Sequence, residues 1–148
     1  MKLIATLLLS LISLSGIAQS DTVHVVFKTH LDVGFTDFAQ NVVEKYMDVY
    51  IPKAIHTARL LEKEEKQKYI WTTGSWIIAE YLKKASPDKR KELESAIHDG
   101  LICWNAYPFT ADHELMDASL FRFALSISND LDKQFDKKTI AAKITDVP

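Results

Sequence analysis

A histidine and an aspartate two residues apart are the side chains best suited to chemistry in this sequence. His30 and Asp32 follow residues 22–29, a β-branched and aromatic segment typical of a β-strand. Side chains at positions i and i+2 of an extended segment point the same way, so the imidazole and the carboxylate can reach one cation together. For zinc, the ligand distances would be about 2.0–2.2 Å. The pair is therefore a candidate metal site.

Asp146 is a third candidate ligand, because it lies at the end of residues 139–145, which we predict to be another strand. The carboxyl ends of parallel strands meet at one edge of a sheet, so Asp146 can join His30 and Asp32 there. One histidine, two carboxylates and an open coordination position would make a zinc site with room for substrate oxygens. Spacing alone leaves an alternative, in which Asp32 caps the next helix and His30 bonds to the backbone.

Strands that alternate with helices must position these side chains. The segments 68–73 and 101–106 are the other two predicted strands, and Gly74 ends the first of them. Alternation of this kind predicts an α/β fold of parallel strands joined by right-handed crossovers. Four strands with flanking helices fit a partial (β/α) barrel or a small open sheet. The predicted helices follow Asp37, resume at Pro52, and then cover residues 75–84, 87–98 and 112–135.

The first 18 residues have the organisation of a secretory signal peptide. Lys2 gives a positive start, residues 3–14 are almost entirely apolar, and Gly16 and Ala18 are small residues before a possible cleavage site. The apolar run is too short to span a bilayer, and the alternative is a buried N-terminal helix. We expect residues 1–18 to be removed and residues 19–148 to be secreted or periplasmic, with no membrane contact.

The composition of the remaining chain indicates one packed and mildly acidic domain. Without Lys2, the 18 Lys and Arg side chains fall to 17 against 20 Asp and Glu, a net charge of −3. That charge gives no electrostatic case for nucleic acid or anionic lipid as a partner. The 47% hydrophobic content, with only four Gly and four Pro, argues for a folded core. The single Cys103 cannot form an internal disulfide, and its strand position favours a small buried apolar role.

Four segments of the sequence resemble the catalytic domain of family-38 glycoside hydrolases, the α-mannosidases. Residues 29–35, Thr-His-Leu-Asp-Val-Gly-Phe, are similar to the His-x-Asp-x-Gly-Trp motif after that family's first strand. The other three similar segments follow in the family's order: residues 71–81, 99–104 and 143–148. They correspond to the second strand and helix, the entry to the third strand, and the strand that carries the nucleophilic aspartate.

The resemblance implies a zinc-dependent retaining α-mannosidase that acts on mannose-containing glycans. In that family two His and two Asp bind zinc, and zinc binds two neighbouring hydroxyls of the mannose ring. Carried over by position, His30 and Asp32 are zinc ligands, and Asp146 is both a ligand and the nucleophile. Retention requires a glycosyl ester on Asp146 and a second carboxyl about 5–5.5 Å away as acid/base.

The family's acid/base aspartate and its second zinc-binding histidine lie beyond the equivalent of Pro148. We therefore expect residues 19–148 to be the N-terminal part of a truncated barrel domain that is inactive alone. Phe35 stands where the family usually has Trp, which predicts an altered sugar subsite. Trp104, His113 and Glu114 follow the third strand and are further candidates to line the sugar site. The alternative makes Trp104 a core aromatic and Glu114 an acid of a first helical turn.

Two other functions fit the same residues. A metal-dependent carbohydrate deacetylase or an amidohydrolase would use a metal-bound water, not a carboxylate, as the nucleophile. A carbohydrate-binding remnant would bind sugar without turnover.

Overall fold

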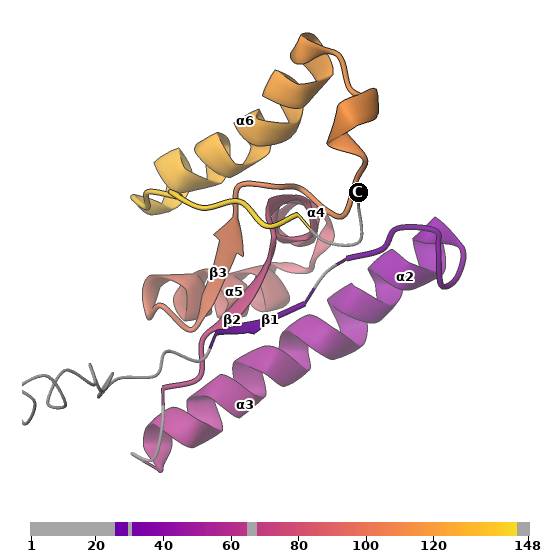
Figure 1. The fold of residues 1–148 in the computed structure, drawn as a ribbon. Coiled ribbons are helices and arrows are strands. Elements are labelled where there is room, and N and C mark those ends of the chain that lie inside the picture. The colour runs from indigo at the N-terminus through magenta and orange to yellow at the C-terminus, as the bar shows by residue number, and fades with distance from the viewer. Residues whose placement is uncertain (1–25, 30, 65–67, 145–148) are drawn as a thin grey trace, which may run out of the picture.

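The computed structural model of the chain describes residues 26–29, 31–64 and 68–144, which form an α/β fold (Figure 1). Three short strands alternate with helices, as the sequence predicted. In chain order the elements are β1 (Phe27–Lys28), α2 (Ala39–Lys45), the π-helix η1 (Tyr46–Tyr50), α3 (Ile51–Lys63), β2 (Trp71–Gly74), α4 (Ser75–Lys84), α5 (Pro87–His98), β3 (Ile102–Asn105), the 3₁₀-helix η2 (His113–Leu115) and α6 (Ala118–Phe135).

The strands form one parallel sheet in the order β1-β2-β3. Phe27 pairs with Trp71, Trp71 pairs with Ile102, and Gly74 at the end of β2 pairs with Asn105 at the end of β3. The predicted parallel strands and flanking helices are therefore confirmed. Because neighbouring strands follow one another along the chain, their carboxyl ends share one edge of the sheet.

The first crossover is a continuous helical rod of α2, η1 and α3, which lies along one side of the sheet (Figure 1). Pro52 lies in the first turn of α3, as predicted. A proline ring has no N–H and clashes with the carbonyl four residues earlier, so the wider π turn of η1 before it relieves that crowding. The rod buries an apolar stripe that includes Val42, Val43, Ile51 and Ile55.

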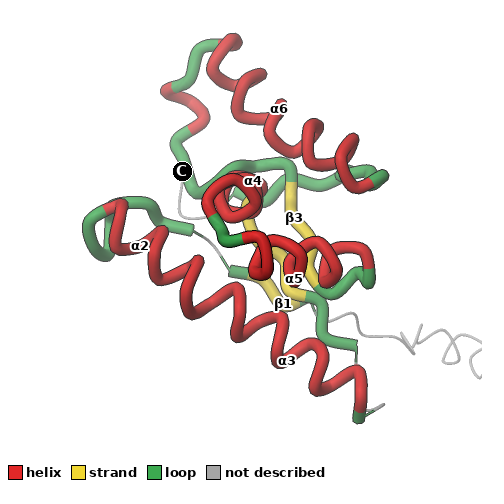
Figure 2. The backbone as a smooth tube through the Cα atoms, turned by 180° about the vertical axis from the view of Figure 1, so that it is seen from behind, coloured by secondary structure: helices red, strands yellow, loops and turns green. Residues whose placement is uncertain are grey.

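The second crossover consists of α4 and α5, and both helices have the predicted ends. Pro87 occupies the first turn of α5, and Gly100 follows that helix with a φ of +72°. A positive φ costs glycine little because it has no Cβ. Seen from behind, α4 and α5 lie in front of the strands, with α3 below them (Figure 2).

The helices α3, α4 and α5 form a helical layer, and the hydrophobic core lies between this layer and one face of the sheet. Trp71 and Thr73 of β2, with Ile102 and Trp104 of β3, are buried, whereas the alternating Cys103 is only half-buried. This period of two follows from strand geometry. Leu93, Ala96 and Ile97 of α5 are fully buried in this core. The core also includes Ile77, Ile78, Tyr81 and Leu101.

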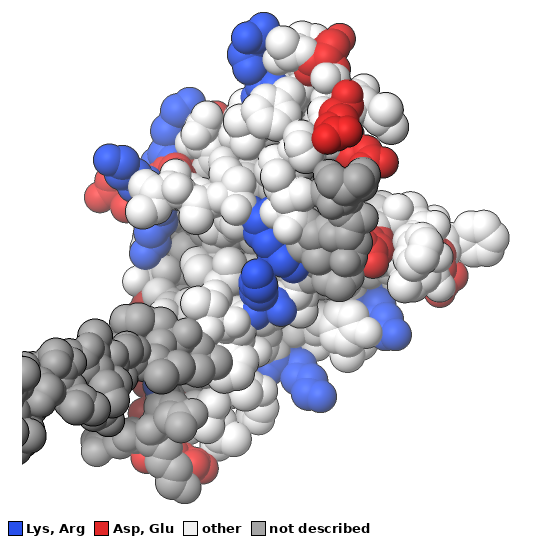
Figure 3. Space-filling model, in the orientation of Figure 1, with Lys and Arg blue, Asp and Glu red and all other residues white. Residues whose placement is uncertain are grey.

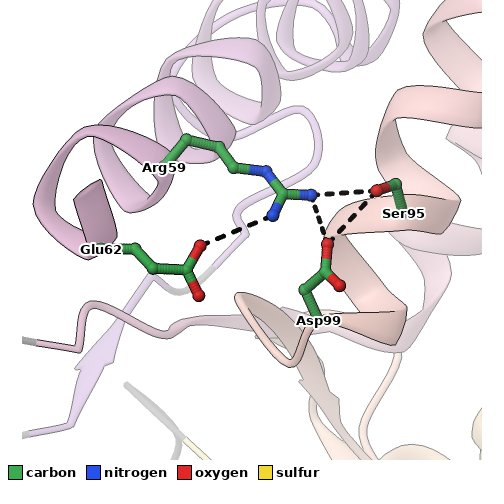
Figure 4. Close-up of polar contacts among 4 residues, drawn as sticks. All are labelled: Arg59, Glu62, Ser95 and Asp99. Atoms are coloured by element: carbon green, nitrogen blue, oxygen red, sulfur yellow. Dashed lines mark hydrogen bonds and ion pairs between the residues drawn. The ribbon is translucent and has the colours of Figure 1, made fainter.

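A polar cluster ties α3 to α5 at the surface of the helical layer (Figure 4). The guanidinium of Arg59 donates to Asp99 Oδ2 and to Ser95 Oγ, and it lies 3.6 Å from the carboxylate of Glu62. The hydrogen bond from Arg59 lowers the pKa of Asp99 below its ordinary value. All these groups are solvated, so the cluster fixes how the helices align more than it stabilises them.

The prediction of one long helix over residues 112–135 is wrong at the N-terminal end. A 3₁₀ turn, His113–Leu115, is followed by a break, and α6 begins at Ala118. The break arises because Asp117 accepts hydrogen bonds from the amides of Ser119 (2.9 Å) and Leu120 (2.8 Å). Such side-chain capping competes with continued helix and sets a new N-terminus.

Residues 139–144, the described part of the predicted fourth strand, form no strand. The segment makes one backbone contact with the residue after β3, from Ala106 N to Ala141 O at 2.9 Å. Side chains contact the segment as well: Asp132 accepts from Thr139 N, and Asn105 accepts from Lys143 N. These side chains satisfy amides that a strand ladder would otherwise use.

Within the described part of the chain, no helix is both long and apolar enough to cross a membrane.

Candidate functional site

The carboxyl edge of the sheet holds a small pocket of about 10 Å³, next to the ends of all three strands. β1 continues beyond Lys28 through Thr29, whose amide donates to Thr72 O at 3.1 Å. Leu31 then turns into the core and is 1% exposed, while its carbonyl accepts from Thr110 N at 3.2 Å. The pocket is lined by Thr29, Leu31, Gly74, Asn105, Tyr107, Phe109, Thr110 and Lys143.

The loop after β3 closes one side of this pocket and caps α4. The amide of Ser75 donates to Tyr107 O at 3.0 Å, and the amide of Trp76 donates to Pro108 O at 3.3 Å. Gly74 makes this approach possible, because a Cβ there would lie 2.9 Å from the carbonyl carbon of Pro108 and closer still to its oxygen. The first amides of α4 are therefore satisfied by a loop from another part of the chain.

Asn105 connects the three segments that meet at this edge. Its Nδ2 donates to Thr73 O of β2 at 3.0 Å. Its Oδ1 accepts from Tyr107 N at 3.0 Å and from Lys143 N at 3.4 Å. One amide side chain thus uses both its donor and its acceptor to join β2, the loop after β3 and the segment 139–144.

Asp32 lies at the same end of the molecule, immediately after the buried Leu31, and is half-buried. It lines a second pocket of about 340 Å³. The other residues of this pocket are mostly polar: Thr36, Asp37, Asn41, Val42, Lys45, Tyr46 and Tyr50. Asp37 already accepts hydrogen bonds from Phe38 N (2.7 Å) and Asn41 Nδ2 (3.0 Å) at the start of α2.

Electrostatics in the second pocket centre on Tyr46. Burial is the main cause of the raised pKa of this phenol; hydrogen bonding with Thr29 lowers the pKa in part, and the neighbouring Tyr50 and Asp32 add smaller increases. Tyr46 is protonated at neutral pH, as an ordinary tyrosine is, and its hydroxyl can donate a hydrogen bond.

His30 and Asp146 lie outside the described residues. Their chain neighbours, however, border one pocket: Thr29 and Leu31 flank His30, and Lys143 precedes Asp146 by three residues. Among the described residues, no group of three His, Cys, Asp or Glu side chains could hold a metal ion. That result involves neither His30 nor Asp146.

The remaining candidates have very different surroundings. Phe35 lies in the loop before α2 and is 87% exposed. Trp104 is buried in the core, packs on Phe135 with ring centroids 5.9 Å apart, and donates from Nε1 to Asp132 Oδ1 at 3.0 Å. Glu114 is exposed in the 3₁₀ turn η2.

His113 lies beside the loop that borders the small pocket. It is half-buried, and its ring meets the ring of Tyr107 edge to face at 6.4 Å. The Nδ1 atom of His113 and the hydroxyl of Tyr107 are buried and have no hydrogen-bond partner among the described residues. Both therefore retain unused hydrogen-bonding capacity next to the carboxyl edge.

Asn105 and Tyr107 were not among the residues singled out from the sequence. The available signal was a polar residue at the end of a buried strand, since Asn105 follows the apolar segment 101–104. Comparison of the chain with protein-family models, curated protein sequences and solved structures finds no match.

Proposed function

We propose that this chain is the N-terminal part of a zinc-dependent retaining glycoside hydrolase, an α-mannosidase that acts on mannose-containing glycans. One observation carries the proposal: neighbours of His30 and Asp146 line a single pocket at the carboxyl edge of a parallel sheet. In α/β folds, that edge is where substrates bind and where catalytic residues are found.

The donor set suits zinc. An imidazole with two carboxylates is a ligand set that zinc accepts, and the half-buried Asp32 lies in a predominantly polar pocket next to the buried Leu31. His30, Asp32 and Asp146 would hold the ion. When bound, zinc acts as a Lewis acid that binds neighbouring hydroxyls of the sugar.

Catalysis by the chain's own residues would centre on Asp146. Its carboxylate attacks the anomeric carbon, the bond to the leaving oxygen breaks, and a glycosyl ester forms. Water then cleaves the ester and restores the carboxylate, so the anomeric configuration is retained. The acid/base that gives and takes the proton is not assigned to any residue of this chain. The exposed ring of Phe35 offers an apolar face for the sugar, and His113 and Glu114 lie beyond β3 as further contacts.

A partial (β/α) barrel is the architecture that we propose for this site. The order β1-β2-β3 is the sequential order of a barrel sheet, and residues 139–144 run beside the end of β3 (Figure 1). Residues 139–145 would then occupy the fourth strand position. Residues 1–18 would direct export, so the protein would act in the periplasm or outside the cell.

The face of the sheet opposite α4 and α5 supports this architecture. Figure 3 views that face, where pale uncharged side chains predominate and several Lys or Arg side chains lie near the middle. Thr72 and Cys103, which alternate with the buried strand residues, are half-buried. Incomplete burial of this face is what half of a barrel would give.

Zinc binding by this chain is the first test. We expect one zinc ion per chain, with affinity lost in His30→Ala and in Asp146→Asn. Asp37→Asn is the matched control, because Asp37 lies beside Asp32 but is engaged at the start of α2. Equal zinc affinity of all four proteins, or no zinc binding, would overturn the proposal.

Turnover separates this function from other metal hydrolases. We expect no hydrolysis of an aryl α-mannoside by residues 19–148, and chelator-sensitive hydrolysis by the longest natural form. In that form, Asp146→Gly with azide should yield a glycosyl azide. Retained zinc with no azide product would instead favour a metal-bound water nucleophile, as in deacetylases. Sugar binding without any turnover would favour a carbohydrate-binding remnant.

A further inference from the structure

We infer that Tyr107 and His113 form a binding site for a sugar hydroxyl, which becomes accessible when the 3₁₀ turn η2 moves away from the loop after β3. The two binding atoms are the Tyr107 hydroxyl and His113 Nδ1. The ligand class rests on the proposed function, whereas the site itself rests on contacts among the described residues. Tyr107 thereby gains a role in binding, and η2 gains the role of a cover over that site.

The Tyr107 hydroxyl and His113 Nδ1 are both buried, and neither has a hydrogen-bond partner among the described residues. Tyr107 is only 5% exposed, and its ring meets the His113 ring edge to face with centroids 6.4 Å apart. Buried polar groups are normally hydrogen-bonded, and each one left unpaired destabilises the fold. Two such groups on rings in contact break this rule at one place, as binding sites commonly do.

One hydroxyl group of a ligand can satisfy both atoms. A tyrosine hydroxyl donates one hydrogen bond, and Nδ1 of a neutral histidine accepts one when the ring proton is on Nε2. A sugar hydroxyl is both acceptor and donor, so it can accept from Tyr107 and donate to His113. A carboxylate has no proton to donate to Nδ1, and an ammonium cannot accept from the hydroxyl. The pair therefore favours a polyol over either kind of ion.

Tyr107 is the fixed half of this site. Its amide donates to Asn105 Oδ1 at 3.0 Å. Its carbonyl accepts from the amide of Ser75 at 3.0 Å and from Ser75 Oγ at 3.3 Å. The ring of Tyr107 also packs against Phe121 of α6, with centroids 6.2 Å apart. These contacts hold the phenol in place without any help from His113.

His113 belongs to the half that can move, because no residue of η2 is buried. The chain is anchored on both sides of this turn. Before it, the amide of Thr110 donates to Leu31 O at 3.2 Å, and after it, the side chain of Asp117 caps α6. Segments with few buried contacts open at a low cost in free energy. Movement of residues 111–116 alone would separate the two rings and expose both polar atoms, while the sheet and α6 stay in place.

Thermal unfolding of the full chain tests whether the Tyr107 hydroxyl is unpaired in the closed state. Tyr107→Phe keeps the ring and removes the hydroxyl, so we expect the melting temperature to rise by about 2–4 °C. Tyr69→Phe is the matched control, because Tyr69 is half-buried beside an open pocket and loses no unpaired buried group. A melting temperature that falls or stays the same in Tyr107→Phe would show that the hydroxyl is already satisfied, which would overturn the inference.

Titration of the full chain with methyl α-mannoside, followed through the NMR signals of the His113 ring, tests the ligand. We expect a saturable shift of these signals, and a Kd that is about three- to tenfold higher in Tyr107→Phe because one hydrogen bond is lost. Tyr81→Phe should bind like the wild type, because it removes a buried, unpartnered hydroxyl that lies on α4 near Lys89. No saturable shift in the wild type, or an unchanged Kd in Tyr107→Phe, would overturn the inference.

The result of this titration is independent of the zinc measurement. Sugar binding that depends on Tyr107 in a chain that binds no zinc would support this site and remove the proposed metal chemistry. Zinc binding together with a sugar affinity that Tyr107→Phe leaves unchanged would support the proposed function and overturn this site.

Discussion

The helical layer and the carboxyl edge of this protein are held together by different forces. The layer of α3, α4 and α5 buries aliphatic side chains such as Ile55, Ile77 and Ile97 against the sheet. The carboxyl edge relies on side chains that bond to backbone, principally Asn105, Asp132 and Asp117. Apolar burial is non-directional, whereas hydrogen bonds fix angles and register. The first region therefore provides stability, and the second provides geometry.

The largest effect should come from the helical layer. Ile97 of α5 is fully buried, so Ile97→Ala should lower the free energy of unfolding by about 3 kcal/mol through lost burial and a cavity. Urea unfolding of both proteins measures the difference. Lys91→Ala, on the exposed side of the same helix, should change it little. A similar loss of unfolding free energy in both variants would contradict the view that apolar burial stabilises the helical layer.

The next largest effect should come from the contact between Gly74 and the loop after β3. Gly74→Ala places a Cβ against the carbonyl of Pro108, and backbone cannot move aside as a flexible side chain can. We expect a loss of about 2 kcal/mol from overpacking, with displacement of residues 107–110. Ser75→Ala removes only a 3.3 Å hydroxyl contact to Tyr107 O and should cost much less. Equal losses in urea unfolding would show that the close approach is not what matters.

Trp104 belongs to both regions, because its ring lies in the core and its Nε1 donates to Asp132. Trp104→Phe keeps an aromatic ring in the core but removes the hydrogen bond to Asp132, which should cost about 1 kcal/mol. Amide exchange should then rise around Thr139 more than in α5. The control is Trp76→Phe, since Trp76 is half-buried against Phe109. Faster exchange confined to α5 would assign Trp104 to the helical layer alone.

The smallest effect should be a pH dependence at the start of α6. Asp117 accepts hydrogen bonds from the amide of Leu120 and from the hydroxyl and amide of Ser119. These bonds lower the pKa of Asp117 below its ordinary value. A lowered folded pKa gives stability that is complete above the unfolded pKa of about 3.9 and is lost as pH falls through the folded pKa. Asn caps a helix without titrating, so Asp117→Asn should lose less thermal stability than the wild type on acidification to pH 3. Identical profiles would contradict the role of this charge.

Sequence patterns sufficed for the helical layer because its signals are local. Pro87 and Gly100 mark the ends of α5, although the Ser86 side chain makes no capping hydrogen bond there, and Gly74 separates β2 from α4. The apolar run 101–104 predicted β3, in which Ile102 and Trp104 are buried. Each of these signals acts within a few residues of its effect.

The carboxyl edge was harder to predict because its determinants are distant along the chain. The β-branched residues 139–145 suggested a strand, yet the partners of residues 139–143 are Asp132 and Asn105, which no local pattern identifies. The break before α6 follows from one side chain, Asp117, inside an otherwise helical pattern. His30, Asp32 and Asp146 remain predictions as zinc ligands, and of the three only Asp32 lies in the described residues.

The capping of α4 by Tyr107 and Pro108 has a consequence for folding during synthesis. The residues of α4 leave the ribosome a whole helix and strand before the carbonyls that cap them. Until then, the amides of Ser75 and Trp76 can be satisfied only by water, so the helix begins with a frayed end. Contacts between segments distant in sequence form late, because a loop must close first. The β2–α4–α5–β3 unit is therefore complete only after the loop after β3 has emerged and reached Gly74.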